Sequence, residues 1–464
     1  MPPDTPPRMP RRRVLIGAGI VALLAAAAAI AAVVVQSRQG DVSNPDVEFR
    51  PESPSPPPPD LPAPTARKDP LDKFVWPVYG RTKDRRRYLP ASTRLRPPYR
   101  RVWRRIIGVL LEFPPVLAGR RLFLLDDSAV LRALGKSTGR TLWKRRLGRL
   151  AASSPAYADG RVFVTILERG RGGAGRVVAL RARDGRILWS RDLPSRTETS
   201  PLVDQGRVYI GSENGTVYSL RQSDGAVRWT FRASGAVKGG PALWRDKLYF
   251  GDYSGRVYAL RQADGRPVWQ VGTSGARLGF GSGSFYATAA VAFGRVYLGN
   301  TDGNVYSFAA DSGKLAWRTR TGGYVYSSAA VAQVPGSRPM VYVGSYDGSF
   351  YGIDARSGKV RWSHHDGGHV SGGATVVGDL VYFANIRKKT TTALGTRTGR
   401  VVYRFPDGAY NPVISDGRTI FLTGNSRIYA LQTPETVRTL RRERALERKR
   451  QRIMEMRRRK GARR

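Results

Sequence analysis

Residues 200–229 read SPLVDQGRVYIGSENGTVYSLRQSDGAVRW, and residues 239–269 repeat the same phrase as GGPALWRDKLYFGDYSGRVYALRQADGRPVW. Each stretch contains four short segments of alternating or fully apolar residues, which is typical of β-strands. Turns such as ENG at 213–215 and DG at 224–225 separate the segments, and turns of this kind favour tight hairpins. One unit therefore predicts a sheet of four antiparallel strands.

The end of this phrase recurs along the chain at intervals of 40 to 48 residues. Each recurrence carries an aromatic residue, namely Trp103, Trp143, Trp189, Trp229, Trp269, Trp317, Trp362 and Tyr403. From the second recurrence on, a glycine stands four residues earlier, at Gly139, Gly185, Gly225, Gly265, Gly313, Gly358 and Gly399. Glycine permits the positive φ of a hairpin, and a ring can bury roughly 150–250 Å² between neighbouring sheets. A strand-rich repeat of this length is typical of a β-propeller with one four-stranded blade per repeat.

The number of units predicts how the ring closes. Seven complete units end at Trp143 through Tyr403, and an eighth unit starts near residue 411 but stops after its third strand. Residues 99–107, which carry Trp103, supply a strand that belongs to no unit. We therefore predict an all-β fold over residues 74–433, an eight-bladed propeller whose N-terminal strand completes the last blade and removes two open sheet edges. A seven-bladed ring with that strand elsewhere is the alternative.

The N-terminal region predicts a membrane anchor. Residues 14–35 form an uncharged apolar run long enough to span a bilayer. Arginines cluster just before the run, so the positive-inside rule places the short tail 1–13 in the cytoplasm and the propeller outside it. A cleaved signal peptide and a twin-arginine export signal are the alternatives. The Pro-rich segment 36–73 is expected to be an extended linker. We thus expect a single-pass protein of the cell membrane with an extracytoplasmic propeller.

Charge and cysteine content limit the chemistry. The chain has no cysteine, which excludes disulfides, thiolate metal sites and cysteine nucleophiles. Its formal net charge is +44, and most of the excess lies between residues 71 and 433. Such a field attracts polyanions, although an arginine-rich coding bias would produce the same composition. Residues 434–464 read as a basic helical or disordered tail, which favours contact with anionic lipid or wall polymer, or is simply a solvated helix. No module for specific nucleic-acid binding is recognisable.

The phrases ALRQADGRPVW (259–269) and GIDARSGKVRW (352–362) resemble the tryptophan-docking motif of the PQQ-like repeat family of quinoprotein dehydrogenases. The resemblance covers about residues 74–432 and implies an eight-bladed propeller. It also implies, for the enzymes of the family, pyrroloquinoline quinone with a calcium or lanthanide ion in the central funnel, typically beside adjacent cysteines and a catalytic Asp. This chain has no cysteine and no evident acidic ion site, so it is more similar to the non-enzymatic, BamB-like branch, although it lacks a lipidated cysteine. We expect no catalytic residue and no cofactor.

Two groups of residues are candidates for a site. The three histidines of the chain lie close together in the sequence, and neutral imidazoles beside a carboxylate can bind a divalent metal. The candidate ligands are His364, His365, Asp366 and His369. An ordinary polar loop is the alternative. The family places a second set of loops at the mouth of the funnel, where aromatic and polar residues suit a ligand or a peptide partner. A small-molecule pocket and ordinary loop structure are the alternatives. These residues are Glu198, Lys238, Arg277, Phe280, Phe285, Tyr286, Tyr324 and Tyr326.

These features favour a membrane-anchored, non-catalytic scaffold that binds proteins or cell-envelope components. A PQQ-dependent dehydrogenase or quinone-binding sensor is one alternative. A propeller that binds polysaccharide or another polyanion of the envelope is a second.

Overall fold

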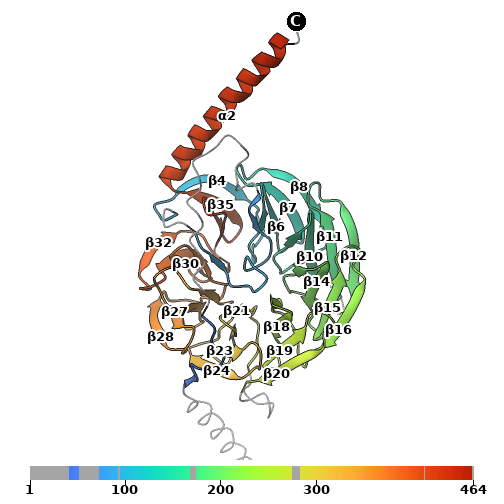
Figure 1. Ribbon diagram of the computed structural model, residues 1–464, viewed down its shortest axis with the longest axis vertical. Helices are drawn as coiled ribbons and strands as arrows, with labels where there is room; N and C mark the ends of the chain where they lie inside the picture. The colour runs from blue at the N-terminus through green and yellow to red at the C-terminus, as the bar shows by residue number, and fades with distance from the viewer. Residues whose placement is uncertain are drawn as a thin grey trace, which may run out of the picture. The chain divides into compact units, whose positions relative to one another are not determined.

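Eight β-sheets form a ring around a central axis (Figure 1), as seen in a computed structural model that describes residues 41–51, 73–91, 95–167, 174–273, 283–411 and 413–461. Within each sheet the strands of the repeat unit follow one another from the axis outward, and consecutive strands of the unit pair antiparallel. The predicted eight-bladed propeller is confirmed.

The blades are numbered in chain order, and the strands of each blade are given from the axis outward. Blade 1 comprises β5 (Val116–Ala118), β6 (Arg121–Leu125), β7 (Val130–Gly135) and β8 (Thr141–Arg146), and blade 2 comprises β9 (Ala156–Ala158), β10 (Arg161–Leu167), β11 (Gly175–Arg181) and β12 (Ile187–Leu193). Blade 3 comprises β13 (Leu202–Asp204), β14 (Arg207–Gly211), β15 (Thr216–Arg221) and β16 (Val227–Arg232), and blade 4 comprises β17 (Ala242–Trp244), β18 (Lys247–Gly251), β19 (Arg256–Arg261) and β20 (Pro267–Gly272). Blade 5 comprises β21 (Ala290–Ala292), β22 (Arg295–Gly299), β23 (Asn304–Ala309) and β24 (Leu315–Arg320). Blade 6 comprises β25 (Ala330–Ala332), β26 (Met340–Gly344), β27 (Ser349–Asp354) and β28 (Val360–His365). Blade 7 comprises β29 (Thr375–Val377), β30 (Leu380–Asn385), β31 (Thr390–Gly395) and β32 (Val401–Phe405).

Blade 8 joins the two ends of the propeller. Its first three strands are β33 (Val413–Ser415), β34 (Ile420–Thr423) and β35 (Arg427–Gln432), and its outer strand is β4 (Arg100–Ile106) from the beginning of the domain. β4 pairs antiparallel with β35, with Trp103 opposite Ala430. The predicted closure of the ring by the N-terminal strand is therefore confirmed, and neither end of the array is left as an open edge.

The repeated tryptophans join each blade to the next. Each indole Nε1 donates to a backbone carbonyl of the following blade at 2.9–3.1 Å. The same ring lies against the hairpin glycine of that blade: a Cβ added at Gly225 (φ +73°) would lie 2.7 Å from the ring of Trp189. Any larger residue would push the two blades apart, so this glycine is required by packing as well as by its backbone conformation.

The exception is Tyr403, and the ring closure explains it. Blade 8 has no hairpin between its last two strands, because β4 comes from the other end of the domain. No hairpin glycine is therefore available to receive an indole. Tyr403 instead meets Tyr99 edge-to-face, with ring centroids 5.1 Å apart.

Three short strands from the N-terminal region add to the predicted four-stranded sheets. β1 (Val42–Ser43) pairs with the outer strand β24, β2 (Val75–Trp76) pairs with the inner strand β5, and β3 (Tyr88–Leu89) pairs in parallel with the inner strand β29. Three blades thus have five strands. The repeat pattern could not predict these pairings because the added strands lie outside the repeats.

Residues 41–51 of the predicted linker pack against blades 5 and 6 and are not a free spacer. The guanidinium of Arg295 is buried and donates to the carbonyls of Pro45 and Val47 at 2.9 Å. Phe49 stacks on Phe293 with ring centroids 5.7 Å apart. Apolar residues and carbonyl acceptors within the Pro-rich sequence therefore make a specific contact with the propeller.

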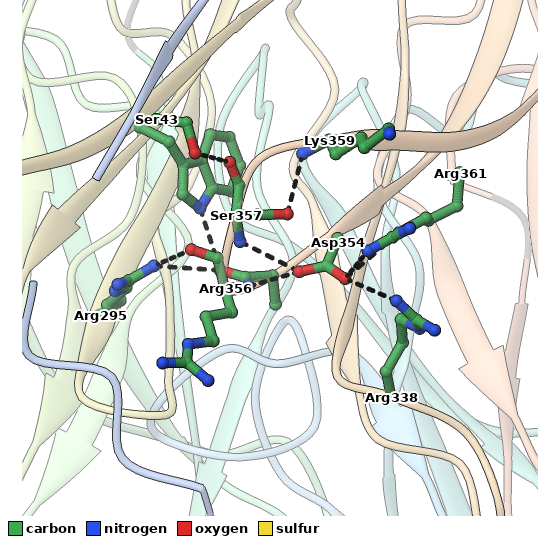
Figure 2. Close-up of polar contacts among 10 residues, drawn as sticks. Ser43, Arg295, Arg338, Asp354, Arg356, Ser357, Lys359 and Arg361 are labelled. Carbon is green, nitrogen blue, oxygen red and sulfur yellow. Dashed lines mark hydrogen bonds and ion pairs between the residues drawn. The ribbon is translucent and has the colours of Figure 1, made fainter. Parts of the chain in front are cut away.

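Figure 2 shows how this segment meets the last hairpin of blade 6. Ser43 Oγ donates to the carbonyl of Ser357 at 2.7 Å, and Arg295 also donates to the carbonyl of Arg356 at 2.6 Å. Asp354 holds the hairpin in place by accepting from Arg361 at 2.8 Å. Residues 41–51 thereby join two neighbouring blades at their outer edge.

The propeller is followed by the helix α2 (Pro434–Gly461), as the composition of the basic tail predicted. Most of its described side chains are exposed, including Leu446 and Met454. Among the described residues, no helix has the length and apolar character needed to cross a bilayer. The predicted anchor 14–35 lies outside these residues.

Candidate binding funnel

The central channel of the propeller contains a segment of the chain that sequence reasoning did not place there. Residues 73–91 run from the inner strand of blade 1, where β2 pairs, to the inner strand of blade 7, where β3 pairs. In Figure 1 the blue part of the chain that precedes β4 runs inside the ring of inner strands, whereas β1, also blue, lies at the outer edge beside β24. We call residues 73–91 the plug.

The plug accepts hydrogen bonds from the inner strands, because the middle residues of these strands direct their backbone amides toward the axis. Five of these amides donate to plug carbonyls at 2.7–2.9 Å: Tyr157 to Pro77, Leu243 to Lys83, Val291 to Asp84, Val331 to Arg86 and Val376 to Arg87. Buried amides without partners are costly, so the plug completes the hydrogen bonding of the ring. Left-handed conformations at Arg81, Arg85 and Arg87 turn the backbone so that successive carbonyls face different blades.

Two arginines of the plug, Arg85 and Arg87, are fully buried, and neither has a carboxylate partner among the described residues. Arg85 donates to the carbonyls of Tyr79, Ser200, Pro201 and Pro241 at 2.6–3.1 Å. Burial, reinforced by the charge of Arg87, lowers the pKa of Arg85 to about 9, so that it remains charged at neutral pH. Arg87 lies over the ring of Tyr79, with its guanidinium carbon 4.4 Å from the ring centroid. These contacts anchor the plug to the beginning of blades 3 and 4.

A cavity of about 210 Å³ opens above the plug, and Tyr79 forms part of its floor. Loops at blade junctions, together with turns inside blades 4 and 6, line its walls. These loops contribute Glu112, Phe113, Glu198, Lys238, Tyr253, Tyr286, Tyr326, Tyr346, Ser371 and Tyr410. We call this cavity the funnel.

Two repeated positions supply most of these side chains. Glu112, Glu198, Lys238, Tyr286, Tyr326 and Ser371 each stand four residues before the first residue of the following inner strand. Tyr253 and Tyr346 each stand two residues after the glycine that ends the second strand of a blade, and Glu213 and Thr301 hold the same place in blades 3 and 5. The funnel is therefore built from equivalent positions of successive blades, with a different residue presented by each.

A lysine bridges two carboxylates on one wall of the funnel. Lys238 Nζ lies 3.2 Å from an oxygen of Glu198 and 3.1 Å from an oxygen of Glu213. It also lies 5.5 Å from the ring centroid of Tyr253. Burial raises the pKa of Glu198, whereas for Glu213 burial is outweighed by the bond and charge of Lys238, which lower its pKa.

Glu112 and Asp127 form a second acidic pair, for which the described part of the chain supplies no ion-paired cation. The backbone amide of Glu112 donates to Asp127 Oδ1 at 3.4 Å. Burial, together with the charges of Asp127 and Glu198, raises the pKa of Glu112 to about 7, against the attraction of Lys238. Burial likewise raises the pKa of Asp127 to about 6. Both carboxyls thus titrate near neutral pH, which is unusual for a surface of a strongly basic protein.

Tyrosine rings cover the remaining wall. Tyr286 meets Tyr326 edge-to-face at 5.6 Å, and Tyr326 meets Tyr346 at 4.9 Å between centroids. Burial raises the pKa of Tyr286, and the nearby charges of Glu198 and Glu112 add to this effect, so the phenol stays neutral. The wall therefore offers ring faces and neutral hydroxyls beside carboxylates.

The structure brings together only some of the predicted funnel residues. Glu198, Lys238, Tyr286 and Tyr326 line the cavity, and Tyr324 lies beside Tyr326 with 54% of its side chain exposed. The prediction for Phe285 was wrong: it is fully buried between blades 4 and 5, where it packs against Tyr306 and close to Gly251. Adjacent residues of an extended loop face opposite directions, so Phe285 points into the core while Tyr286 faces the funnel. Arg277 and Phe280 lie outside the described residues.

The histidine cluster is spread over different surroundings. His364 lies 3.7 Å from Asp366, His365 contacts Ser349 at 3.2 Å, and His369 stacks on Tyr346 at 4.7 Å. Burial lowers the pKa of His364. Within the described ranges, no group of three or more His, Asp or Glu side chains is arranged to hold a metal ion. Strand alternation separates His364 from His365, which the sequence spacing alone did not reveal.

The residues of the funnel do not fit the quinone cofactor of the enzymatic relatives. Pyrroloquinoline quinone is a tricarboxylate, whereas the lining contributes two glutamates and, among the described residues, one basic side chain, Lys238. That lysine already contacts Glu198 and Glu213. The cavity is also smaller than the roughly 300–1,000 Å³ of typical small-molecule pockets. Both the charge and the size of the funnel therefore disfavour this cofactor.

Comparisons with known proteins place this fold. A family profile described as outer membrane protein assembly factor BamB matches residues 96–170, 127–280 and 273–443. No curated protein matches the chain. Among solved structures, BamB from Moraxella catarrhalis is 17% identical with a TM-score of 0.59, and the match covers 73% of this chain and 98% of that one.

Quinone-dependent enzymes share the same architecture. The quinohemoprotein alcohol dehydrogenase ADHIIG from Pseudomonas putida HK5 is 14% identical with a TM-score of 0.64, covering 78% of this chain and 81% of that one. A europium-containing methanol dehydrogenase is also 14% identical, with a TM-score of 0.63 and coverage of 78% and 99%. At these identities the structures show a common fold and nothing finer. Because the profile matches most of the sequence, the chain belongs to the family of outer membrane protein assembly factor BamB, built from PQQ-like repeats.

Proposed function

We propose that this protein is a non-catalytic scaffold that binds a protein partner at the mouth of the funnel. The observation that carries the proposal is the plug, which fills the channel below a shallow cavity lined with tyrosines and carboxylates. Aromatic residues are enriched where proteins bind one another, because they bury a large area at a small cost in side-chain entropy. Membership in the BamB family supports the same role.

We further propose that residues 14–35 anchor the chain in the cell membrane with the propeller on the extracytoplasmic side. The apolar run and the arginines that precede it support this arrangement. The partner is then a protein or another component of the cell envelope.

Site-specific photocrosslinking in intact cells tests the binding surface. A crosslinking amino acid at position 324, where the side chain is 54% exposed beside the funnel, is compared with one at position 142 on the outer strand β8, where exposure is 52%. We expect position 324, and also position 410 in the funnel lining, to capture the same protein and position 142 not to capture it. Capture from position 142 alone would place the interface on the rim and contradict the proposal.

An activity assay tests the absence of catalysis. The purified full chain is incubated with pyrroloquinoline quinone and calcium, and dye-linked oxidation of alcohols and sugars is followed. We expect no turnover above that of the protein without quinone. Saturable oxidation would show that the protein is an enzyme.

A second role, contact with an anionic surface, is favoured by the outer edge of blades 8 and 1. β4 is exposed at six of its seven residues, including Arg100, Arg101, Arg104 and Arg105. The neighbouring outer strand β8 ends in exposed basic residues, and α2 continues the chain from blade 8. Removing residues 435–464 should weaken salt-sensitive binding to vesicles containing anionic lipid, and unchanged binding would exclude the helix from this role.

A further inference from the structure

One wall of the funnel already holds a cation. The ammonium of Lys238 lies between the carboxylates of Glu198 and Glu213 and near the face of Tyr253. A carboxylate pair combined with an aromatic face is a favourable environment for an ammonium or guanidinium group. The position of Lys238 therefore indicates that this wall of the funnel favours a positively charged group.

Glu112, another acidic residue of the funnel, forms no ion pair with a basic side chain in the described ranges. Within the described part of the chain, the side-chain carboxylate of Glu112 makes no hydrogen bond, although Glu112 lines the funnel and is only partly exposed. The charged groups that act on it are Asp127, Glu198 and, more weakly, Lys238. Carboxylates thus outnumber cations around Glu112, in a protein whose formal net charge is +44.

Aromatic rings complete the environment of Glu112. Burial raises the pKa of both Tyr286 and Tyr410, and both lie close enough for the charge of Glu112 to add to this effect. Tyr326 and Tyr346 continue the aromatic wall at 5.6 and 4.9 Å between successive centroids. Ring faces attract cations, and this attraction strengthens when the site is partly withdrawn from water.

We propose that the funnel binds a cationic side chain, lysine or arginine, of the protein partner, with its charged end beside Glu112 and its stem against Tyr286 and Tyr326. The cavity of about 210 Å³, closed below by Tyr79 and the plug, accommodates a single side chain entering from the mouth. This inference rests on the proposed function, because it specifies which group of the partner is recognised. A free polyamine shares the same chemistry, and competition between the two separates them.

The test uses Nα-acetyl-lysine methylamide as the probe and the full-length protein with ring-labelled tyrosines. The norleucine analogue, which has the same stem and no charge, is the control ligand. We expect saturable changes in the NMR signals of Tyr286 and Tyr326 with the lysine probe and none with the norleucine analogue at equal concentration. Equal effects of both ligands, or no saturable change with the lysine probe, would overturn the proposal.

The pH dependence tests the role of Glu112. A carboxyl whose pKa is about 7 is about one-tenth ionised at pH 6 and almost fully ionised at pH 8.5, while the lysine ammonium stays charged at both. Affinity for the lysine probe should therefore rise about tenfold between these pH values. The Glu112→Gln variant should bind at least fivefold more weakly than the parent at pH 8.5, with a smaller pH dependence that reflects Asp127.

The control variant Glu435→Gln removes the same charge at the start of α2. It should leave the affinity for the probe unchanged. An equal loss in both variants would mean that only net charge matters and would overturn the assignment to Glu112. Unchanged affinity in Glu112→Gln would overturn it as well.

A titration with spermidine separates the two sources of the cation. The proposal predicts that a lysine-containing peptide competes with spermidine at comparable concentrations. A preference for spermidine of more than tenfold would assign the site to a free amine and overturn the assignment to a protein side chain. Binding of the lysine probe without any captured protein at position 324 would instead count against the proposed function, so the two failures are distinguishable.

Discussion

The plug and the funnel mouth lie on the same axis, but a charged side chain is stabilised in the plug and disfavoured in the funnel. In the plug, the cation Arg85 is fully buried and bonded to four carbonyls. In the funnel, the carboxylate of Glu112 is held in a partly buried place where its ionisation is disfavoured. Groups that stabilise the fold are satisfied internally, whereas a group kept without an internal partner is available to a ligand, at a cost in stability.

The largest expected effect is the loss of the buried cation of the plug. Arg85→Met leaves several buried carbonyls without a donor, and each unsatisfied group costs about 1–3 kcal/mol. We expect the free energy of unfolding to fall by about 3–5 kcal/mol in chemical denaturation. The control Arg104→Met, on the exposed edge of blade 8, should change it by less than about 0.5 kcal/mol. A small loss in Arg85→Met would mean that the plug does not hold the ring together.

In the funnel, removing the charge of Glu112 should stabilise the fold, whereas removing the charge of Arg85 destabilises it. The pKa of Glu112 is about 7 in the folded protein, above its ordinary value of 4.5, so the folded state keeps a proton that the unfolded state releases between these pH values. Stability therefore falls as pH rises through this window. Because glutamine does not titrate, Glu112→Gln should be more stable than the parent by about 1–2 kcal/mol at pH 8.5 and by almost nothing at pH 4.5. Destabilisation at pH 8.5 would show that the carboxylate has a structural partner.

A pair of tyrosines gives a finer comparison. The hydroxyl of Tyr79, in the plug, donates to Asn411 at 2.9 Å. Removing it in Tyr79→Phe should cost about 1 kcal/mol. Tyr286→Phe, in the funnel wall, should change the free energy of unfolding by less than about 0.5 kcal/mol, because Tyr286 lines the cavity and its hydroxyl has no hydrogen bond among the described residues. Similar losses in both variants would erase the distinction between the two regions.

The smallest effect is expected at the outer edge, away from the axis. Arg356 forms an exposed ion pair with Asp46 at 2.7 Å. Arg356→Ala should cost at most about 1 kcal/mol, since exposed ion pairs contribute little. Denaturation in low and high salt would check it, and a larger loss would mean that residues 41–51 are as important to the ring as the plug.

The arrangement of the blades could be predicted from the sequence because the blades repeat at regular intervals. The spacing of Gly225 and Trp229, repeated in seven units, predicted the blades, and the incomplete eighth unit predicted the pairing of Trp103 with the last blade. The plug has no period, and its bonds join Lys83 or Arg87 to residues more than 150 positions away, so no local pattern could reveal it. Left-handed arginines are equally hard to foresee, because this conformation is usually taken by glycine or asparagine.

The funnel could be predicted in part for the same reason. Glu198, Lys238, Tyr286 and Tyr326 share one offset from the next inner strand, and that offset, once recognised, also identifies Glu112. Tyr253 and Tyr346 occupy equivalent turns, in the phrases GDYSG and GSYDG, and aligning the units would have found them. The charge state of Glu112 could not be read from any alignment of units, because it depends on the burial and on the neighbouring charges that only the folded ring brings together.

Amide hydrogen exchange of the inner strands tests the central claim, that residues 73–91 fill the channel and form the floor of the funnel. The amides of Leu243, Val291, Val331 and Val376 donate to plug carbonyls. We predict that these four exchange only through global unfolding, and that all four lose protection together in Arg85→Met. Rapid exchange of these amides in the intact protein would mean that the channel is open, and would contradict the claim that the plug fills it.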